Sequence, residues 1–341
     1  MSPVPKEQPT ILITGASGFI GSFLAEEALD RGMKVIAAVR GTSSRKYLQD
    51  NRIVFVELDF SSAANLAGKL EKLVSEFGKI DYVVHNAGIT KAPKEDDYLE
   101  INTRFTQNFL DALTRAKAIP SKFVYMSSLA AYGPGNPVTM EPIKDKHIPA
   151  PLTAYGKSKL LAENAIKARQ DIPWAIIRPT AVFGPREKEI FALFKIVNRH
   201  LHPWIRVKNQ KMSFIYVKDL VRAVLDAAVS PLSGRSYFIS DGQTYQGNVF
   251  GGYVKKALGK KALDIPVSGK LMNAIARLLE MLTALVGKTP GLNSEKAVEL
   301  GSVNWTCDIS PAVTELNFKP HYTLGSAIEE TAVWYKKEGW L

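Results

Sequence analysis

Three glycines at fixed spacing separate a short apolar run from a helical pattern. Residues 10–14 are β-branched and apolar, Gly15-Ala16-Ser17-Gly18-Phe19-Ile20-Gly21 follows, and a helical pattern covers residues 19–31. Gly15 permits a positive φ, Gly18 leaves room for a pyrophosphate, and Gly21 allows close packing of the helix on the strand. The free N–H groups at the helix start attract phosphate. This segment predicts a dinucleotide site that includes Gly15, Ser17, Gly18, Phe19, Ile20 and Gly21.

Strand and helix patterns alternate through the first half of the chain. Strands are expected at residues 10–14, 34–39, 53–58, 80–84, 122–126 and 174–177, and helices at 19–31, 66–77, 98–116 and 155–169. Such alternation predicts an α/β, Rossmann-type doubly wound parallel sheet with helices on both faces. We expect residues 1–180 to form the dinucleotide-binding domain. Residues 181–341 are expected to form mainly a smaller C-terminal substrate-binding lobe, with segments that interleave with the first domain and helices at 189–200 and 270–286.

The end of the second predicted strand indicates which dinucleotide binds. An acid at this position binds the ribose of NAD, whereas an arginine accommodates the 2′-phosphate of NADP. The stretch here carries no acid and three cations, Arg40, Arg45 and Lys46. NADP is therefore predicted, with Arg40 as the main contact, and NAD is the alternative. Asp59, after the third strand, is expected near the adenine.

A tyrosine and a lysine lie four residues apart at the start of a predicted helix. This spacing puts Tyr155 and Lys159 on one helix face. An ammonium group beside a phenol favours the phenolate and lowers the phenol's pKa, so the pair suits proton exchange with an alcohol or a carbonyl. Ser127 and Ser128 follow the fifth strand, at the sheet edge where ligands bind. Ser128, Tyr155 and Lys159 are therefore predicted to be catalytic.

These elements occur in an order that resembles the extended short-chain dehydrogenase/reductase family. The matching segments, from residue 10 to the C-terminus, are the glycine turn, His85-Asn86-Ala87-Gly88, Asn102, Ser127-Ser128-Leu129-Ala130-Ala131-Tyr132-Gly133, Tyr155 with Lys159, Arg178-Pro179, Val182-Phe183-Gly184-Pro185, Phe214-Ile215-Tyr216-Val217-Lys218-Asp219-Leu220, and the stretch from Trp305-Thr306-Cys307-Asp308 to Leu316-Asn317-Phe318-Lys319-Pro320.

The resemblance implies a role for each matched position. Tyr155 would be the general acid/base, Lys159 would hold the nicotinamide ribose and lower the Tyr155 pKa, and Ser128 would orient the substrate. Asn102 is expected in the catalytic set as a brace of its helix. The remaining cofactor contacts would be Phe60, Asn86, Ala87, Gly88 and Pro179. The substrate pocket would comprise Thr90, Ser128, Tyr132, Thr180 and Phe183.

The family contains epimerases, dehydratases and oxidoreductases, and three departures favour the last. Leu129-Ala130 stand where dehydratases carry an Asp-Glu pair, and Met212 stands where many nucleotide-sugar enzymes carry an arginine. The cations after the second strand favour NADP, whereas such epimerases usually retain NAD. We therefore expect an NAD(P)(H)-dependent oxidoreductase acting on a carbonyl or alcohol. The alternatives are a nucleotide-sugar epimerase and, further removed, a nonenzymatic dinucleotide-binding scaffold.

Charge and composition limit the partners. The 341 residues carry a net charge of +11, and residues 186–222 contribute nine Lys and Arg against three acids. This basic segment could bind an anionic small-molecule substrate or remain a solvated face. A nucleic-acid partner is not expected on a dinucleotide enzyme. The histidines show no ligand spacing, so no metal is expected.

The remaining features concern location and assembly. The single cysteine, Cys307, fits a cytoplasmic protein, and neither a signal peptide at residues 1–10 nor a transmembrane segment is expected. An apolar stripe in residues 270–286 (Leu271, Ile275, Leu278, Leu279, Leu282 and Leu285) suits core or dimer packing, or contact with a membrane surface or a greasy substrate. Homodimerisation is common in the family and is expected here.

Overall fold

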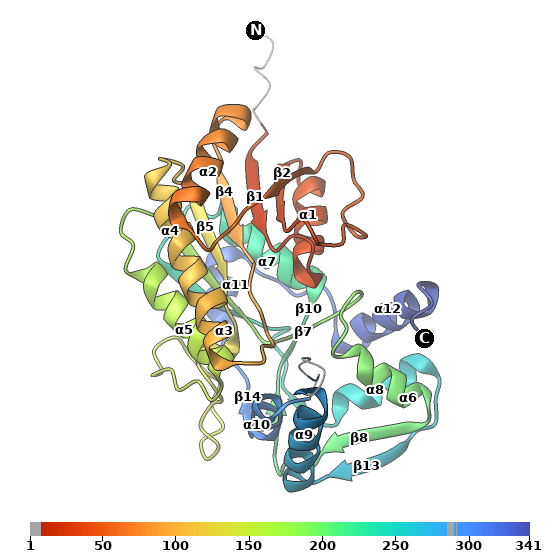
Figure 1. Ribbon diagram of the computed structural model, residues 1–341. Coiled ribbons are helices and arrows are strands. Elements are labelled where there is room, and N and C mark those ends of the chain that lie inside the picture. Colours follow the sequence, from red (N-terminus) through yellow and green to blue (C-terminus); the bar gives the residue numbers. More distant parts are fainter. Residues whose placement is uncertain (1–7, 285–289, 291) are drawn as a thin grey trace.

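A seven-stranded parallel sheet forms the centre of the protein (Figure 1). The computed structural model describes residues 8–284, 290 and 292–341, so Leu285 and most of the segment 1–10 fall outside it. The strands run in the order β11-β6-β5-β4-β1-β2-β3, and every neighbouring pair is parallel. This order confirms the predicted doubly wound fold. The strands are β1 (Thr10–Thr14), β2 (Lys34–Val39), β3 (Val54–Glu57), β4 (Tyr82–His85), β5 (Lys122–Met126), β6 (Trp174–Pro179) and β11 (Arg235–Ile239).

Helices cover both faces of the sheet. Ile11 and Ile13 of β1 face a core that contains α1 (Phe19–Asp30) and α7 (Val217–Val229). Leu12, between them, faces the opposite core with α2 (Ala63–Phe77), α4 (Phe105–Arg115) and α5 (Ala154–Lys167). Successive side chains of a strand point to opposite faces, so continuous apolar runs such as residues 10–14 are what a sheet covered on both faces requires.

The edge of the sheet and the helix expected at residues 98–116 differ from the sequence-based expectation. β11 was not predicted, and it returns the second half of the chain to the sheet beside β6. The expected helix 98–116 begins earlier, as α3 (Glu95–Tyr98), and passes through a π-helical segment, Leu99–Arg104, before α4. The division of the chain near residue 180 stays a prediction, since α7 and β11 follow that point and belong to the sheet layers.

The rest of the second half forms short sheets and helices. β7 (Ala181–Phe183) pairs with β10 (Phe214–Tyr216), β8 (Leu201–Ile205) with β13 (Leu263–Val267), and β9 (Lys211–Met212) with β12 (Tyr245–Gln246) and β14 (Asn304–Trp305). The helices are α6 (Phe191–Asn198), α8 (Val249–Leu258), α9 (Gly269–Ala284), α10 (Ser294–Gly301), α11 (Ser310–Leu316) and α12 (Leu324–Lys337). Among the described helices, none is long and apolar enough to cross a bilayer.

A buried ion pair joins α5, the helix that carries the candidate residues Tyr155 and Lys159, to the sheet. Arg178 of β6 donates from Nε and Nη2 to the two carboxylate oxygens of Glu163 on α5, at 2.9 and 2.7 Å, and both side chains are fully buried. Ser127 Oγ donates to the same carboxylate at 2.6 Å. Because a bidentate pair fixes both distance and orientation, it sets how α5 lies against β5 and β6.

We expect Arg178→Met to lower the free energy of unfolding by about 3–5 kcal/mol, because it leaves the Glu163 carboxylate buried without its cation. Urea denaturation measures this change. Arg52→Met, which removes the exposed pair with Asp50, is the matched control and should change stability little. Equal losses in the two variants would contradict the structural role of the buried pair.

Candidate active site

One large cavity lies along the carboxyl ends of the sheet strands. Its volume is about 1930 Å³, and residues that follow β1, β2, β4, β5 and β6 line it. The predicted cofactor residues that line it are Gly15, Ser17, Gly18, Phe19, Ile20, Arg40, Asp59, Phe60, Asn86, Ala87, Gly88, Tyr155, Lys159 and Pro179. The structure thus gathers segments up to 164 residues apart around one space.

The glycine turn leaves no room for side chains. Gly15 has a φ of +64°, and a Cβ there would approach the Ala87 backbone to 2.9 Å. A Cβ on Gly21 would lie 2.1 Å from the Gly15 carbonyl oxygen, so Gly21 serves helix packing and does not line the cavity. A Cβ on Gly88 would lie 2.8 Å from Asn102 Oδ1 and 3.1 Å from Lys159 Nζ. These close approaches form the cradle that a dinucleotide pyrophosphate fits.

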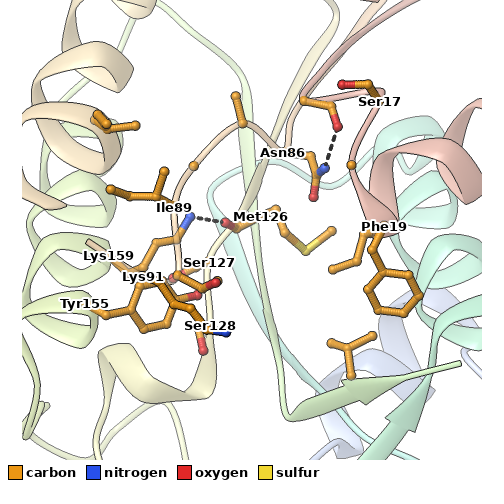
Figure 2. A pocket seen from close by; sticks show the side chains of 18 of the residues that line it. Ser17, Phe19, Asn86, Ile89, Lys91, Met126, Ser127, Ser128, Tyr155 and Lys159 are labelled. Atoms are coloured by element: carbon orange, nitrogen blue, oxygen red, sulfur yellow. Dashed lines mark hydrogen bonds between the residues drawn. The ribbon is translucent and has the colours of Figure 1, made fainter. Parts of the chain in front are cut away.

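Ser127, Ser128, Tyr155 and Lys159 gather on one side of the pocket, and Ser17, Phe19 and Asn86 lie on the other (Figure 2). The Thr153 hydroxyl accepts from the Gly156 N–H at 3.1 Å and caps the helix that carries Tyr155 and Lys159. Lys159 Nζ donates to the Met126 carbonyl oxygen at 2.9 Å, which ties the catalytic helix to the end of β5. The predicted catalytic trio therefore shares one wall of the cavity.

The pKa values in this wall differ from the expectation. Burial raises the pKa of the Tyr155 phenol, the Ser128 hydroxyl lowers it in part, and the Glu299 and Glu189 carboxylates raise it further. Burial lowers the pKa of Lys159 to about 8. Burial outweighs the other contributions, so the Tyr155 pKa lies above its ordinary value here, and the lowering effect expected of Lys159 stays a prediction. The phenol stays protonated at neutral pH.

Asn102 does not line the cavity and acts as a brace. Its Oδ1 accepts from the Ile89 N–H at 2.9 Å, and its Nδ2 donates to the Ile89 carbonyl oxygen and to Ser158 Oγ, both at 3.0 Å. These bonds hold the loop after β4 against α5, one residue from Lys159. Asn102 lies in the π-helical segment Leu99–Arg104, so the wider helical turn occurs at the residue that bonds to Ile89 and Ser158.

The cavity end near β2 contains both charge signs. Arg40, Ser43, Ser44 and Lys46 line it, whereas the Arg45 guanidinium lies over the Phe55 ring at 4.3 Å. Glu57, at the end of β3, also lines the cavity beside Gly41, and the sequence analysis did not identify it. The pairing of β3 with β2 places Glu57 beside the end of β2, and the sequence alone does not show this pairing.

Two of the predicted substrate residues lie elsewhere. Thr90, Ser128 and Thr180 line the cavity. Tyr132 does not, because its hydroxyl donates to Asp145 and its ring lies under the Arg178 guanidinium. Phe183 is also outside the lining, since the β7–β10 pairing turns it into the core against Phe214 and Phe250.

Helix α10 adds acidic residues that sequence reasoning missed. Glu295 accepts from the Ala154 N–H at the start of α5, and Glu299 accepts from Thr153 Oγ1 at 3.3 Å. Both carboxylates line the cavity and lie at the positive end of the catalytic helix. No local pattern reveals them, because they are about 140 residues from Tyr155 in the chain.

Most of the basic segment 186–222 does not face the cavity. Of its nine cations, Arg186 and Lys188 line it. Arg186 binds Ser22 and Glu26 of α1, Lys218 pairs with Glu330, and Arg222 pairs with Asp219. Within the described part of the chain, no cluster of three or more metal-ligating side chains occurs.

The family model for the NAD-dependent epimerase/dehydratase family matches residues 11–240. The chain belongs to this family. The match confirms the resemblance to extended short-chain dehydrogenases/reductases, and it makes the chain an enzyme of that type. The ceramide reductase of Caulobacter vibrioides is 25% identical over 334 residues, which cover 97% of this chain and 96% of the relative. The UDP-glucose 4-epimerase of Vibrio cholerae is 27% identical over 348 residues, covering 96% and 95%.

A solved structure shows the same fold. The UDP-glucuronic acid 4-epimerase of Bacillus cereus, in complex with NAD, superimposes with a TM-score of 0.75 at 23% identity, covering 96% of this chain and 99% of that one. Reductases and epimerases are thus both among the proteins that resemble this chain.

We expect Glu299→Gln to move the basic limb of the pH–rate profile to lower pH, by up to about one unit. The Glu299 carboxylate raises the Tyr155 pKa, so removing its charge lowers that pKa while glutamine still accepts from Thr153. Initial rates across pH measure the shift. Glu71→Gln, on the exposed side of α2, is the control, and an unshifted Glu299→Gln profile would contradict the assignment.

Proposed function

We propose that this protein is an NADP(H)-dependent oxidoreductase that interconverts a carbonyl and an alcohol on an uncharged, largely apolar substrate. Residues 1–180 would hold the dinucleotide and the reacting groups, and residues 181–341 would mainly shape the substrate end of the cavity. The observation that carries the proposal is that the lysines Lys91 and Lys296 at that end of the cavity are each paired with a carboxylate.

The reacting groups fit this chemistry. When bound, the nicotinamide of the dinucleotide supplies or accepts the hydride. Tyr155 donates its proton to the carbonyl oxygen, or takes one from the alcohol, and Ser128 holds the same oxygen by a hydrogen bond. The Tyr155 pKa lies above neutral, so the phenol is in the protonated form that donates to a carbonyl oxygen. Lys159, held at Met126, is in place to contact the ribose.

Among the described residues, two of the lysines at the substrate end are paired with carboxylates, which leaves little free positive charge for a diphosphate. Lys91 pairs with Glu189 at 3.0 Å, and Lys296 pairs with Glu299 at 3.2 Å, so the charge of each lysine is matched by a carboxylate. Met212 lines the cavity where many nucleotide-sugar enzymes carry arginine. The same end is lined by the apolar or aromatic side chains Ile89, Tyr98, Ile101, Leu129, Val182, Leu300 and Trp305. An anionic nucleotide sugar is disfavoured here, whereas a lipid-like ketone fits.

The similarity to a ceramide reductase agrees with such a substrate. The similarity to a UDP-glucose 4-epimerase keeps epimerisation as the second candidate, and Lys188 is the cation at the substrate end that would serve it. The two candidates differ in cofactor turnover, because an epimerase oxidises and reduces one carbon with no net consumption of NADPH.

We expect the enzyme to oxidise NADPH with long-chain ketones in detergent and to leave UDP-sugars unchanged. Tyr155→Phe should lower kcat by about 10²- to 10⁴-fold while NADPH still binds, because the proton donor alone is lost. Absorbance of NADPH and its binding fluorescence measure the two effects, and Tyr253→Phe on α8 is the control. UDP-sugar interconversion without NADPH oxidation, or full turnover by Tyr155→Phe, would contradict the proposal.

Arg40→Ala should raise the KM for NADPH about tenfold or more and leave that for NADH nearly unchanged, because one charged hydrogen bond to the 2′-phosphate is lost. Arg45→Ala is the matched control, since Arg45 stacks on Phe55 and does not line the cavity. A preference of the wild-type enzyme for NADH would contradict the assignment of Arg40 and would point to Glu57 as the ribose contact.

A further inference from the structure

Helix α9 presents an apolar face that the described chain does not cover. Leu271, Ile275, Leu278 and Leu282 follow the spacing i, i+4, i+7 and i+11, so they form one stripe, and Met281 lies at its edge. These five side chains are between 39% and 66% exposed. The opposite face already has its partner, because Met272 and Ala276 are buried against Ala297 of α10. Among the described residues, one side of α9 is packed against α10 and the other side is exposed.

Cations lie along one edge of this face. Lys270 and Arg277 lie on α9 itself, and both are exposed. The Arg206 N–H donates to the Val267 carbonyl oxygen at 2.9 Å, which brings Arg206 next to the start of α9. The acid of this helix, Glu280, is turned inward, where its carboxylate accepts from the backbone N–H and the hydroxyl of Ser294. The rim of the stripe is thus positive.

The face also lies close to the substrate end of the cavity. α9 packs on α10, and Figure 1 shows the two side by side at the end of the molecule away from the N-terminus. Leu300 of α10 packs against the core shared with α9 and also lines the cavity. A surface that engaged α9 would therefore lie one helix away from the cavity lining.

We propose that the outer face of α9, with Arg206, Lys270 and Arg277 at its rim, docks on an anionic membrane surface. Helices that lie in a membrane interface combine an apolar stripe with lysine and arginine beside it, and negative lipids attract such a rim. A second copy of this chain is a poorer occupant, because pairing two such faces would bring like charges together. Docking also gives a role to Arg206. This cation of the basic segment does not line the cavity and forms no ion pair with a described residue.

Docking would place the cavity at the surface that holds a lipid-like substrate, and this consequence rests on the proposed function. The docking itself does not, because it is measured without turnover.

The test is flotation of the full-length protein with two kinds of vesicle, one of phosphatidylcholine with phosphatidylglycerol and one of phosphatidylcholine alone. We expect flotation with the anionic vesicles and less of it in high salt, since salt screens the rim. Leu278→Glu combined with Leu282→Glu should lower the partition coefficient more than about tenfold. Lys270→Ala or Arg277→Ala should lower it about fivefold each, from the contribution of one basic residue near a charged surface.

Val333→Glu, an equally exposed apolar position on α12, is the matched control and should float like the wild type. Circular dichroism verifies that each variant is folded. Failure of the wild type to float, or unchanged flotation of the double leucine variant, would overturn the proposal. So would a wild-type dimer that the double variant converts to a monomer without any vesicle binding, because α9 would then be a subunit interface.

Turnover of a long-chain ketone in detergent, without vesicles, separates the two proposals. Flotation without ketone reduction by the wild type overturns the proposed function and supports docking. Ketone reduction without flotation supports the proposed function and overturns the docking proposal.

Discussion

The bidentate pair between Arg178 and Glu163 joins the elements that carry the candidate active site. Glu163 lies on the same helix as Tyr155 and Lys159, and Arg178 lies on the strand that leads to Pro179 and Thr180 at the cavity. Ser127 binds the same carboxylate, so the serine pair, the catalytic helix and β6 meet at one buried charge. Charges buried in this way are costly unless fully paired, and this requirement leaves the three elements little freedom to shift.

A second set of charges works at the opposite end of the catalytic helix. Glu295 and Glu299 come from α10, yet they bind the first backbone and side-chain donors of α5. Both carboxylates lie at the positive end of that helix, and the Glu299 carboxylate raises the Tyr155 pKa. The part of the chain that shapes the substrate end thereby also sets the protonation of the proposed acid. The ion pairs Lys91–Glu189 and Lys296–Glu299 make that end nearly neutral, although the chain as a whole is strongly basic.

The sequence predicted those features whose place in the fold follows from the pattern of neighbouring residues in the chain. The apolar runs are strands because a sheet covered on both faces buries every side chain of such a run, and Gly15, Gly18 and Gly21 follow the first strand at the spacing that the turn requires. β11 was not predicted, because the sequence of residues 235–239 does not indicate that they pair with β6 in the sheet. Tyr132 and Phe183 follow family motifs, but Asp145, Arg178 and the β7–β10 pairing turn them away from the cavity.

The sequence alone predicted the fold class and the glycine turn and singled out Ser128, Tyr155 and Lys159 as candidates, because each depends on spacing within one or two turns of chain. The tertiary structure decided the charge of the substrate end, the raised pKa of Tyr155 and the exposure of α9. These properties arise from contacts between segments far apart in the chain, such as Lys91 with Glu189 and Ala154 with Glu295. Desolvation and ion pairing depend on what surrounds a group in space, and that is fixed only once the chain has folded.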